Sequence, residues 1–244
     1  MESGESVRPT GAIPPRRSPH TPRAMSIHDL PHDALAAKAR QAVTNTTADA
    51  EMMAAVLGHG YTPEAFDAAL ADLVAYETLI QEQTDLKGQA ERATEDLDAS
   101  RATFHRDVYM DHAERARRVF RGEGGTLKRL GLNGARARAF DRWAGQVRQL
   151  YATALADDAL QARLAERGLT AEVLQGALAR LDEIVTEDQA QEDLKGRAQQ
   201  ARRDRDGARE PVLAWLSGCY EAAERAFKDH PDWLERIGKV APSE

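Results

Sequence analysis

Histidines close to carboxylates are the residues of this chain that could bind a metal ion. A di-iron site of the ferritin type needs a glutamate three residues before each ligating histidine of a helix. His105 and His112, seven residues apart and near Asp111 and Glu114, come closest to such a site. We predict instead a solvent-facing polar surface with two ordinary histidines, and no metal. The residues three places before the candidate histidines are not carboxylates: Val56, Ala102, Tyr109 and Phe227.

Nucleophilic chemistry has one candidate, Cys219, the single cysteine of the chain. It lies among apolar residues, where a free cysteine usually behaves as a small buried hydrophobe. The only histidine near it in sequence is His230, about three helical turns further on. A glycine-rich stretch at 121–129 does not follow a strand, which a phosphate-binding loop requires. The sequence therefore predicts no catalytic residue and no cofactor, and we expect a protein that is not an enzyme.

One stretch of the chain is strongly basic, and we call its basic residues the basic belt. An anionic partner, such as nucleic acid or an acidic protein surface, would explain it. The alternative is pairing with acidic residues of the same molecule or of a second copy. Phe120 and Phe140 occupy helical core positions and not the stacking positions typical of single-strand binding. Only Glu123 and Asp141 oppose the belt, which comprises Arg115, Arg117, Arg118, Arg121, Lys128, Arg129, Arg136, Arg138 and Arg142.

The composition of the 244 residues indicates an all-α protein that needs neither disulfides nor a metal to fold. Ala, Leu, Glu, Arg and Gln are abundant, and these residues form helices readily. The net charge of −7 argues against a dedicated nucleic-acid-binding protein. A single cysteine fits a reducing compartment, so we expect a cytoplasmic protein. No apolar run approaches the roughly 20 residues that would span a bilayer.

An internal duplication is the most informative feature of the sequence. Shifted by 108 positions, residues 60–102 align with residues 168–210 without a gap, and 19 of 43 positions are identical. The tetrapeptide Asp-Leu-Lys-Gly occurs at 85–88 and again at 193–196. Further on, Ala-Glu-Arg-Ala at 113–116 matches 223–226 after a two-residue insertion in the second copy. We predict a tandem duplication of an antiparallel helical bundle.

The predicted organisation is a disordered N-terminal segment at 1–30 followed by two units, at 31–132 and 133–244. Met25 is a plausible alternative start within the first segment. Each unit is expected to contain three to four helices. A short helix should end near Gly58 or Gly168, and a longer one should begin at Thr62 or Thr170, because threonine caps helix N-termini.

The glycine of each Asp-Leu-Lys-Gly allows two interpretations. Lysine followed by glycine is typical of a helix end, which would make the chain reverse at Gly88 and Gly196. Alternatively, one long helix tolerates an interior glycine at a cost of roughly 1 kcal/mol. The turn is slightly favoured because it gives helices of similar length. Pro211 indicates a firmer break in the second unit. Leu-Lys-Arg-Leu-Gly at 127–131 and Leu-Glu-Arg-Ile-Gly at 234–238 should cover the end of each bundle.

Polar residues are also repeated between the units, and they have a functional and a structural explanation. They could form a shared functional surface. The structural explanation is favoured, since Asp98 and Arg101 can pair on one helix, as Asp206 and Arg209 can. Glutamines and a threonine in a helical seam can also bond to neighbouring helices. The repeated residues in the first unit are Thr78, Gln81, Gln83, Asp85, Lys87, Asp96, Asp98 and Arg101.

Two functional hypotheses follow. The first is a non-enzymatic structural or protein-interaction module that binds a protein partner or itself. The second is a nucleic-acid-associated protein that binds through the basic belt, residues 115–142.

Overall fold

A computed structural model describes residues 26–134 and 137–239, and within these ranges the chain forms helices and no strand. This confirms the all-α prediction. The predicted disordered segment at 1–30 lies mostly outside the described residues, but its last part is ordered, because 27–29 form a short 3₁₀ helix. The elements are η1 (Ile27–Asp29), α1 (His32–Thr47), α2 (Ala50–Leu57), α3 (Pro63–Phe104), η2 (His105–Tyr109), α4 (Met110–Val119), α5 (Gly124–Arg129), α6 (Phe140–Leu155), α7 (Asp158–Ala165), α8 (Ala171–Ala226) and α9 (Pro231–Arg236).

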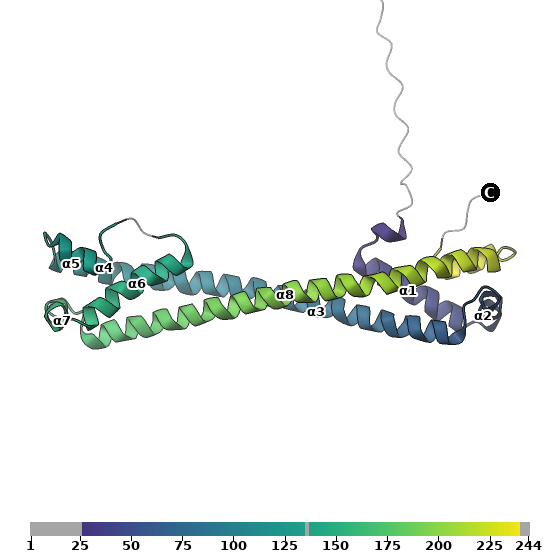
Figure 1. The fold of residues 1–244 in the computed structure, drawn as a ribbon, viewed down its shortest axis with the longest axis horizontal. Coiled ribbons are helices and arrows are strands. Elements are labelled where there is room, and N and C mark those ends of the chain that lie inside the picture. The colour runs from purple at the N-terminus through teal and green to yellow at the C-terminus, as the bar shows by residue number, and fades with distance from the viewer. Residues whose placement is uncertain (1–25, 135–136, 240–244) are drawn as a thin grey trace, which may run out of the picture.

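Two long antiparallel helices give the molecule the shape of a rod (Figure 1). One is α8, with 56 residues, and the other is α3, with 42 residues, which continues through η2 into α4. At about 1.5 Å per residue, α8 is about 84 Å long. Contacts fix the antiparallel register: Arg205 reaches Gln83, while Arg180 reaches Ser100 further along α3.

The short helices gather at the two ends of the rod, and each end has its own hydrophobic core (Figure 1). The terminal lobe comprises α1, α2, the start of α3, the end of α8 and α9. The internal lobe comprises the end of α3, η2, α4 to α7 and the start of α8. The predicted boundary between residues 132 and 133 falls in the loop between α5 and α6. Each core contains residues from both sides of that boundary.

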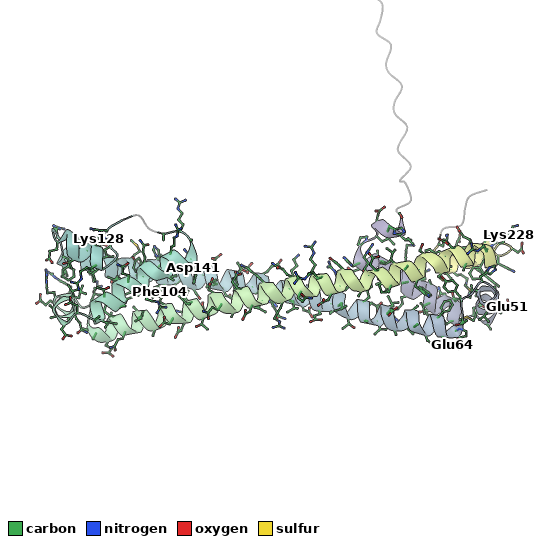
Figure 2. The ribbon with its side chains drawn as sticks, viewed as in Figure 1. Glu51, Glu64, Phe104, Lys128, Asp141 and Lys228 are labelled. Carbon is green, nitrogen blue, oxygen red and sulfur yellow. The ribbon has the colours of Figure 1, made fainter. Side chains whose placement is uncertain are left out.

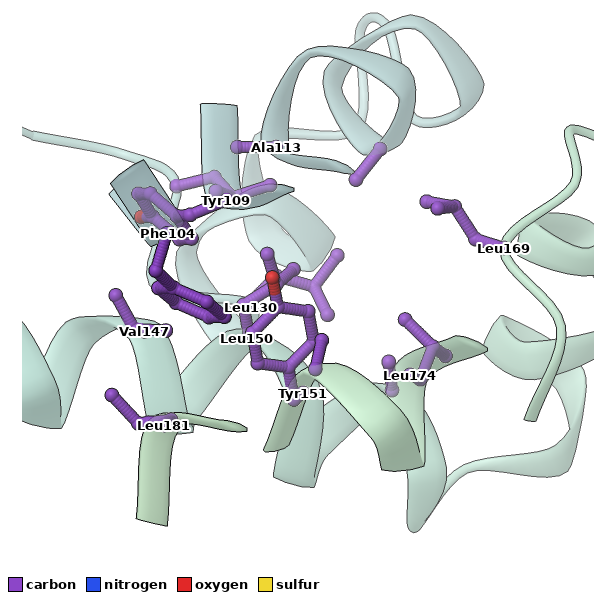
Figure 3. Packing of buried hydrophobic residues seen from close by; sticks show 14 of the residues in the cluster. Phe104, Tyr109, Ala113, Leu130, Val147, Leu150, Tyr151, Leu169, Leu174 and Leu181 are labelled. Carbon is purple, nitrogen blue, oxygen red and sulfur yellow. The ribbon is translucent and has the colours of Figure 1, made fainter. Parts of the chain in front are cut away.

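The internal core illustrates this arrangement (Figure 3). Phe104 and Tyr109 of the first half pack in one cluster with Val147, Tyr151 and Leu181 of the second half. In the terminal core, α1 and the start of α3 pack with the end of α8 and with α9. A lobe therefore becomes complete only when both halves of the chain are present.

Capping explains where several helices begin. The Thr62 and Thr170 hydroxyls accept hydrogen bonds from Ala65 N and Val173 N, both at 3.4 Å, so the two predicted starts are confirmed. Gly168 has a left-handed φ of 78°, as predicted for a helix end. In the first half that role belongs to Gly60, with φ of 87°, and not to the predicted Gly58.

Corresponding elements recur at a constant interval. Helices α6, α7 and α8 begin 108 residues after α1, α2 and α3. Helices α1 and α6 both have 16 residues, and α2 and α7 both have eight. Asp49 and Asp157, which cap α2 and α7, stand at the same interval.

The favoured turns at Gly88 and Gly196 are wrong, because both glycines lie inside continuous helices. Leu86 and Ala90 are buried on either side of Gly88, so the apolar seam runs through the glycine without interruption. A reversal there would remove Ala90 from the seam. The predicted break at Pro211 is also wrong, since α8 continues through it. The residues that follow Pro211 are held in the terminal core by their packing, beginning with Val212.

Between the lobes the rod has little core of its own. The buried residues of this middle section are Leu86, Ala90, Gln191 and Ala201. Gln191 is 3% exposed, and its side-chain amide donates to the Thr94 hydroxyl at 2.8 Å. A satisfied polar pair in an otherwise apolar seam favours one register of the two helices.

The π-helical turn η2 accounts for a length difference between the two halves. Phe104 and Val212 are 108 positions apart, whereas Phe120 and Phe227, the C-caps of α4 and α8, are 107 apart. The first half thus has one extra residue, and η2 accommodates it, since a π turn closes over five residues. After η2, buried residues of the first half correspond to buried residues 107 positions later in the second half. His112, for example, corresponds to Cys219. The Ala-Glu-Arg-Ala match therefore does not align structurally equivalent residues.

Candidate functional surfaces at the two ends

His105 of η2 and His112 of α4 both pack against α6, where His105 is half-buried and His112 is buried. The Nδ1 of His105 accepts a hydrogen bond from the Trp143 indole at 3.0 Å. The Nδ1 of His112, which is 9% exposed, lies 3.2 Å from the Tyr151 hydroxyl. Burial lowers the pKa of His112 below its ordinary value. The predicted polar surface is therefore wrong, and the reason is the large aromatic residues that α6 presents to these histidines.

The carboxylates near these histidines form ion pairs with arginines one turn away. Asp111 lies 2.8 Å from Arg115, and Glu114 pairs with Arg118. Across residues 26–134 and 137–239, no group of three or more histidine, cysteine or acidic side chains lies close enough together to hold a metal ion.

Cys219 is buried in the core of the terminal lobe, as predicted. Burial raises the pKa of its thiol to about 12, so the thiol is protonated at neutral pH.

The basic belt lies in the internal lobe, at one end of the rod and not at its middle (Figure 1). The belt lies near the middle of the sequence, but α3 runs along the rod and so places the belt at one end of the molecule. Arg115, Arg118 and Arg129 pair with acids, the last with Asp157 at 2.9 Å. Arg136 lies outside the described residues. The rest of the belt forms no ion pair within the described part of the chain: Arg117, Arg121, Lys128, Arg138 and Arg142.

The repeated arginines have a role that the sequence did not reveal. Arg101 donates to the Arg138 carbonyl at 2.7 Å, and Arg209 donates to the His28 carbonyl at 2.8 Å. Each arginine thus holds the segment that leads into the first long helix of one half, α6 or α1. The predicted pairs Asp98–Arg101 and Asp206–Arg209 do not form in the described structure. Asp206 pairs instead with Arg205, at 2.7 Å. A bond to a distant carbonyl leaves no spacing signal in a sequence.

One of the two repeated glutamine positions bonds across the seam, as the structural explanation predicts, whereas Gln81 bonds to Asp85 of its own helix. Gln83 accepts from Arg205 at 2.7 Å, and Gln191 donates to Thr94. The repeated threonine does not, because the Thr78 hydroxyl bonds back to a carbonyl of its own helix.

A second repeated contact closes each lobe. In the terminal lobe, Asp49 lies 2.9 Å from Arg236, and Gln41 donates to the Arg236 carbonyl at 3.1 Å. In the internal lobe, Asp157 lies 2.9 Å from Arg129, and Gln149 donates to the Arg129 carbonyl at 3.0 Å. The next residues, Leu130 and Ile237, are fully buried, which confirms that these two turns cover the lobes.

Two open grooves lie along α3. One of 780 Å³ lies between α1 and α3 and is crossed by the Arg40–Glu77 ion pair. A second of 730 Å³ continues towards the middle of the rod past Val74 and Leu86. Their walls carry mostly polar side chains that already bond within the molecule, as Gln81 does to Asp85.

No protein-family model matches the sequence, and no curated protein or solved structure resembles the chain significantly. Among the described helices, none combines the length and the apolar character needed to cross a bilayer.

Proposed function

We propose that this protein is a non-enzymatic structural or protein-interaction module, a spacer that displays two related lobes at opposite ends of a rod. The observation that carries the proposal is the separation of two hydrophobic cores by a helix pair with four buried residues of its own. A rod of this shape is suited to binding partners at its two separated ends.

The proposal includes an internal duplication. The constant interval between matching helices, caps and glycines supports it, as does the repeated Asp–Arg contact. In this view each unit supplies the start of a long helix to one lobe and the end of that helix to the other. The two units then pair as an exchanged dimer would, with approximate twofold symmetry about the middle of the rod.

Affinity capture from native lysate, with and without nuclease, tests the proposal. The full chain serves as bait, and its mass is followed by size exclusion with light scattering. We expect protein partners, or further copies of the chain, that survive nuclease treatment. Loss of all captured material on nuclease treatment would contradict a protein-interaction role.

A second candidate function is nucleic-acid binding through the basic belt. It is favoured by the five belt residues that form no ion pair in the described structure. Binding to phosphates should weaken steeply with salt, with a log–log slope of about −0.9 for each phosphate neutralised. A flat salt response would exclude this candidate.

A further inference from the structure

At two structurally matching positions, the two ends of the rod carry opposite charges. At the interval that relates the two halves beyond η2, Arg117 and Lys128 of the internal lobe correspond to Glu224 and Glu235 of the terminal lobe. The two lobes are built from corresponding helices and are closed by corresponding Asp–Arg contacts, so the fold does not require this difference. The charges at these two positions are therefore not dictated by the architecture.

The end of the internal lobe exposes unpaired positive charge. Lys128 lies at its tip (Figure 2), and Arg117 and Arg121 stand one turn apart where α4 ends. The acids Asp158, Glu166 and Glu172 also lie at this end, on α7, just after it and in the first turn of α8. Arg167 is a fourth basic residue there and is exposed, so the basic residues without an ion pair outnumber such acids by one among the described residues. At the same end, in the first turn of α8, Val173 exposes 39% of its surface.

The end of the terminal lobe exposes unpaired negative charge. Glu51 and Glu64 lie at its tip (Figure 2). Lys228 and Arg225 are the exceptions, and Leu57 is an apolar residue there that is 45% exposed. The further acids that form no ion pair among the described residues are Asp67, Glu221, Asp229, Asp232 and Glu235.

We propose that the chain associates head to tail with further copies of itself, the basic end of one copy docking on the acidic end of the next. The inference rests on the proposed spacer function and names its partner. Complementary charge brings unlike ends together and keeps like ends apart. An interface between unlike ends does not close on itself, so the copies form open linear arrays. Leu57 and Val173 supply apolar contact at the junction.

Sedimentation velocity of the full chain over a range of concentrations and salt tests this association. At low salt the average mass should rise with concentration beyond that of a dimer. At high salt it should return to the monomer mass of 26.8 kDa, because salt screens charges between exposed surfaces.

Charge reversal at each end makes the test specific. The basic-end variant carries Arg117→Glu, Arg121→Glu and Lys128→Glu. The acidic-end variant carries Asp67→Lys, Glu221→Lys and Glu235→Lys. Each variant alone should stay monomeric, since both of its ends then have the same sign. An equimolar mixture of the two should regain association, which a misfolded variant would not do.

A matched control reverses three exposed acids in the middle of the rod: Glu82→Lys, Glu95→Lys and Asp204→Lys. It has the same change in net charge as the acidic-end variant and should associate like the natural chain. Monomers at every concentration and salt, or a limiting dimer, would overturn the inference. A chain that is monomeric but still captures other proteins from lysate would contradict this inference and would leave the proposed function standing.

Discussion

The carboxylate of Asp49 lies 2.9 Å from the guanidinium of Arg236, so α2, near the start of the described chain, is tied to α9, its last helix. The same contact joins Asp157 to Arg129 at the other end of the rod. In both cases the acid caps a short helix of one half, and the arginine comes from the closing turn of the other half. Each lobe is therefore sealed by a contact between the two halves.

These contacts predict acid sensitivity. Hydrogen bonds from the Met52 backbone and from Arg236 lower the pKa of Asp49 below its ordinary value. Arg129 and the Leu160 backbone do the same for the pKa of Asp157. A carboxyl with a lowered pKa stabilises the fold at any pH above its ordinary pKa, and this stability is lost as pH falls through the folded pKa.

Urea unfolding at pH 7 and at pH 3 measures this effect. The double variant Asp49→Asn, Asp157→Asn should be less stable than the natural chain at pH 7 and should lose less stability on acidification. Asp72→Asn, at an exposed position without an ion pair in the described structure, is the control and should behave like the natural chain. An unchanged acid dependence in the double variant would contradict this role.

Because Gly88 and Gly196 lie inside continuous helices, we predict that replacing either glycine with alanine stabilises the protein. A Cβ at Gly196 would meet no atom within 4 Å, and one at Gly88 would meet only Arg92 Nη1 at 3.9 Å. Each substitution to alanine should raise the free energy of unfolding by about 0.5–1 kcal/mol, because alanine loses less entropy in a helix. Thermal and urea unfolding check this, and a loss of stability would point to a turn at these positions.

Replacing Gly131 or Gly238 with alanine is predicted to destabilise the protein. Their φ values of 69° and 83° are left-handed, and a Cβ would lie 3.0 Å and 2.8 Å from the Oε1 of Gln149 and Gln41. Alanine at either position should cost about 1–2 kcal/mol, since it strains the backbone and displaces a glutamine. Similar losses in both variants are expected, measured by urea unfolding. A neutral outcome would show that the closing turns do not depend on glycine.

We predict that the buried Gln191 side chain stabilises the middle of the rod. Replacing it with alanine removes the bond to Thr94 and leaves space in the seam. The variant should therefore lose about 1–2 kcal/mol of stability in urea unfolding. Gln189→Ala, on the exposed face of the same helix, is the matched control and should be near neutral. Equal effects of the two changes would argue against a seam that depends on Gln191.

Local patterns of the sequence predicted several elements correctly, because their causes lie within a few residues. Thr62 and Thr170 cap α3 and α8, and Leu130 and Ile237 cover the lobes. The constant interval between matching segments is also visible without a structure. Burial of Cys219 follows from its apolar neighbours.

Features that depend on distant partners could not be predicted in this way. From the sequence alone, Gly88 is typical of a helix end. Only the structure shows that α8 packs along α3 on both sides of Gly88. His112 is surrounded by charged residues in sequence, and only the packing of Tyr151 buries it. The basic belt occupies the middle of the sequence, but the length of α3 places it at one end of the molecule.

The account depends most on the two halves sharing both lobes, and fluorescence energy transfer between paired labels tests that directly. One sample carries labels at Glu51→Cys and Lys128→Cys, and the other at Glu51→Cys and Lys228→Cys, while the natural Cys219 stays buried. At high salt, where the chain is expected to be monomeric, we predict low transfer between 51 and 128, which lie at opposite ends of the rod, and high transfer between 51 and 228, which share one end. High transfer for the first pair and low transfer for the second would mean that each half folds on itself, and would contradict the account.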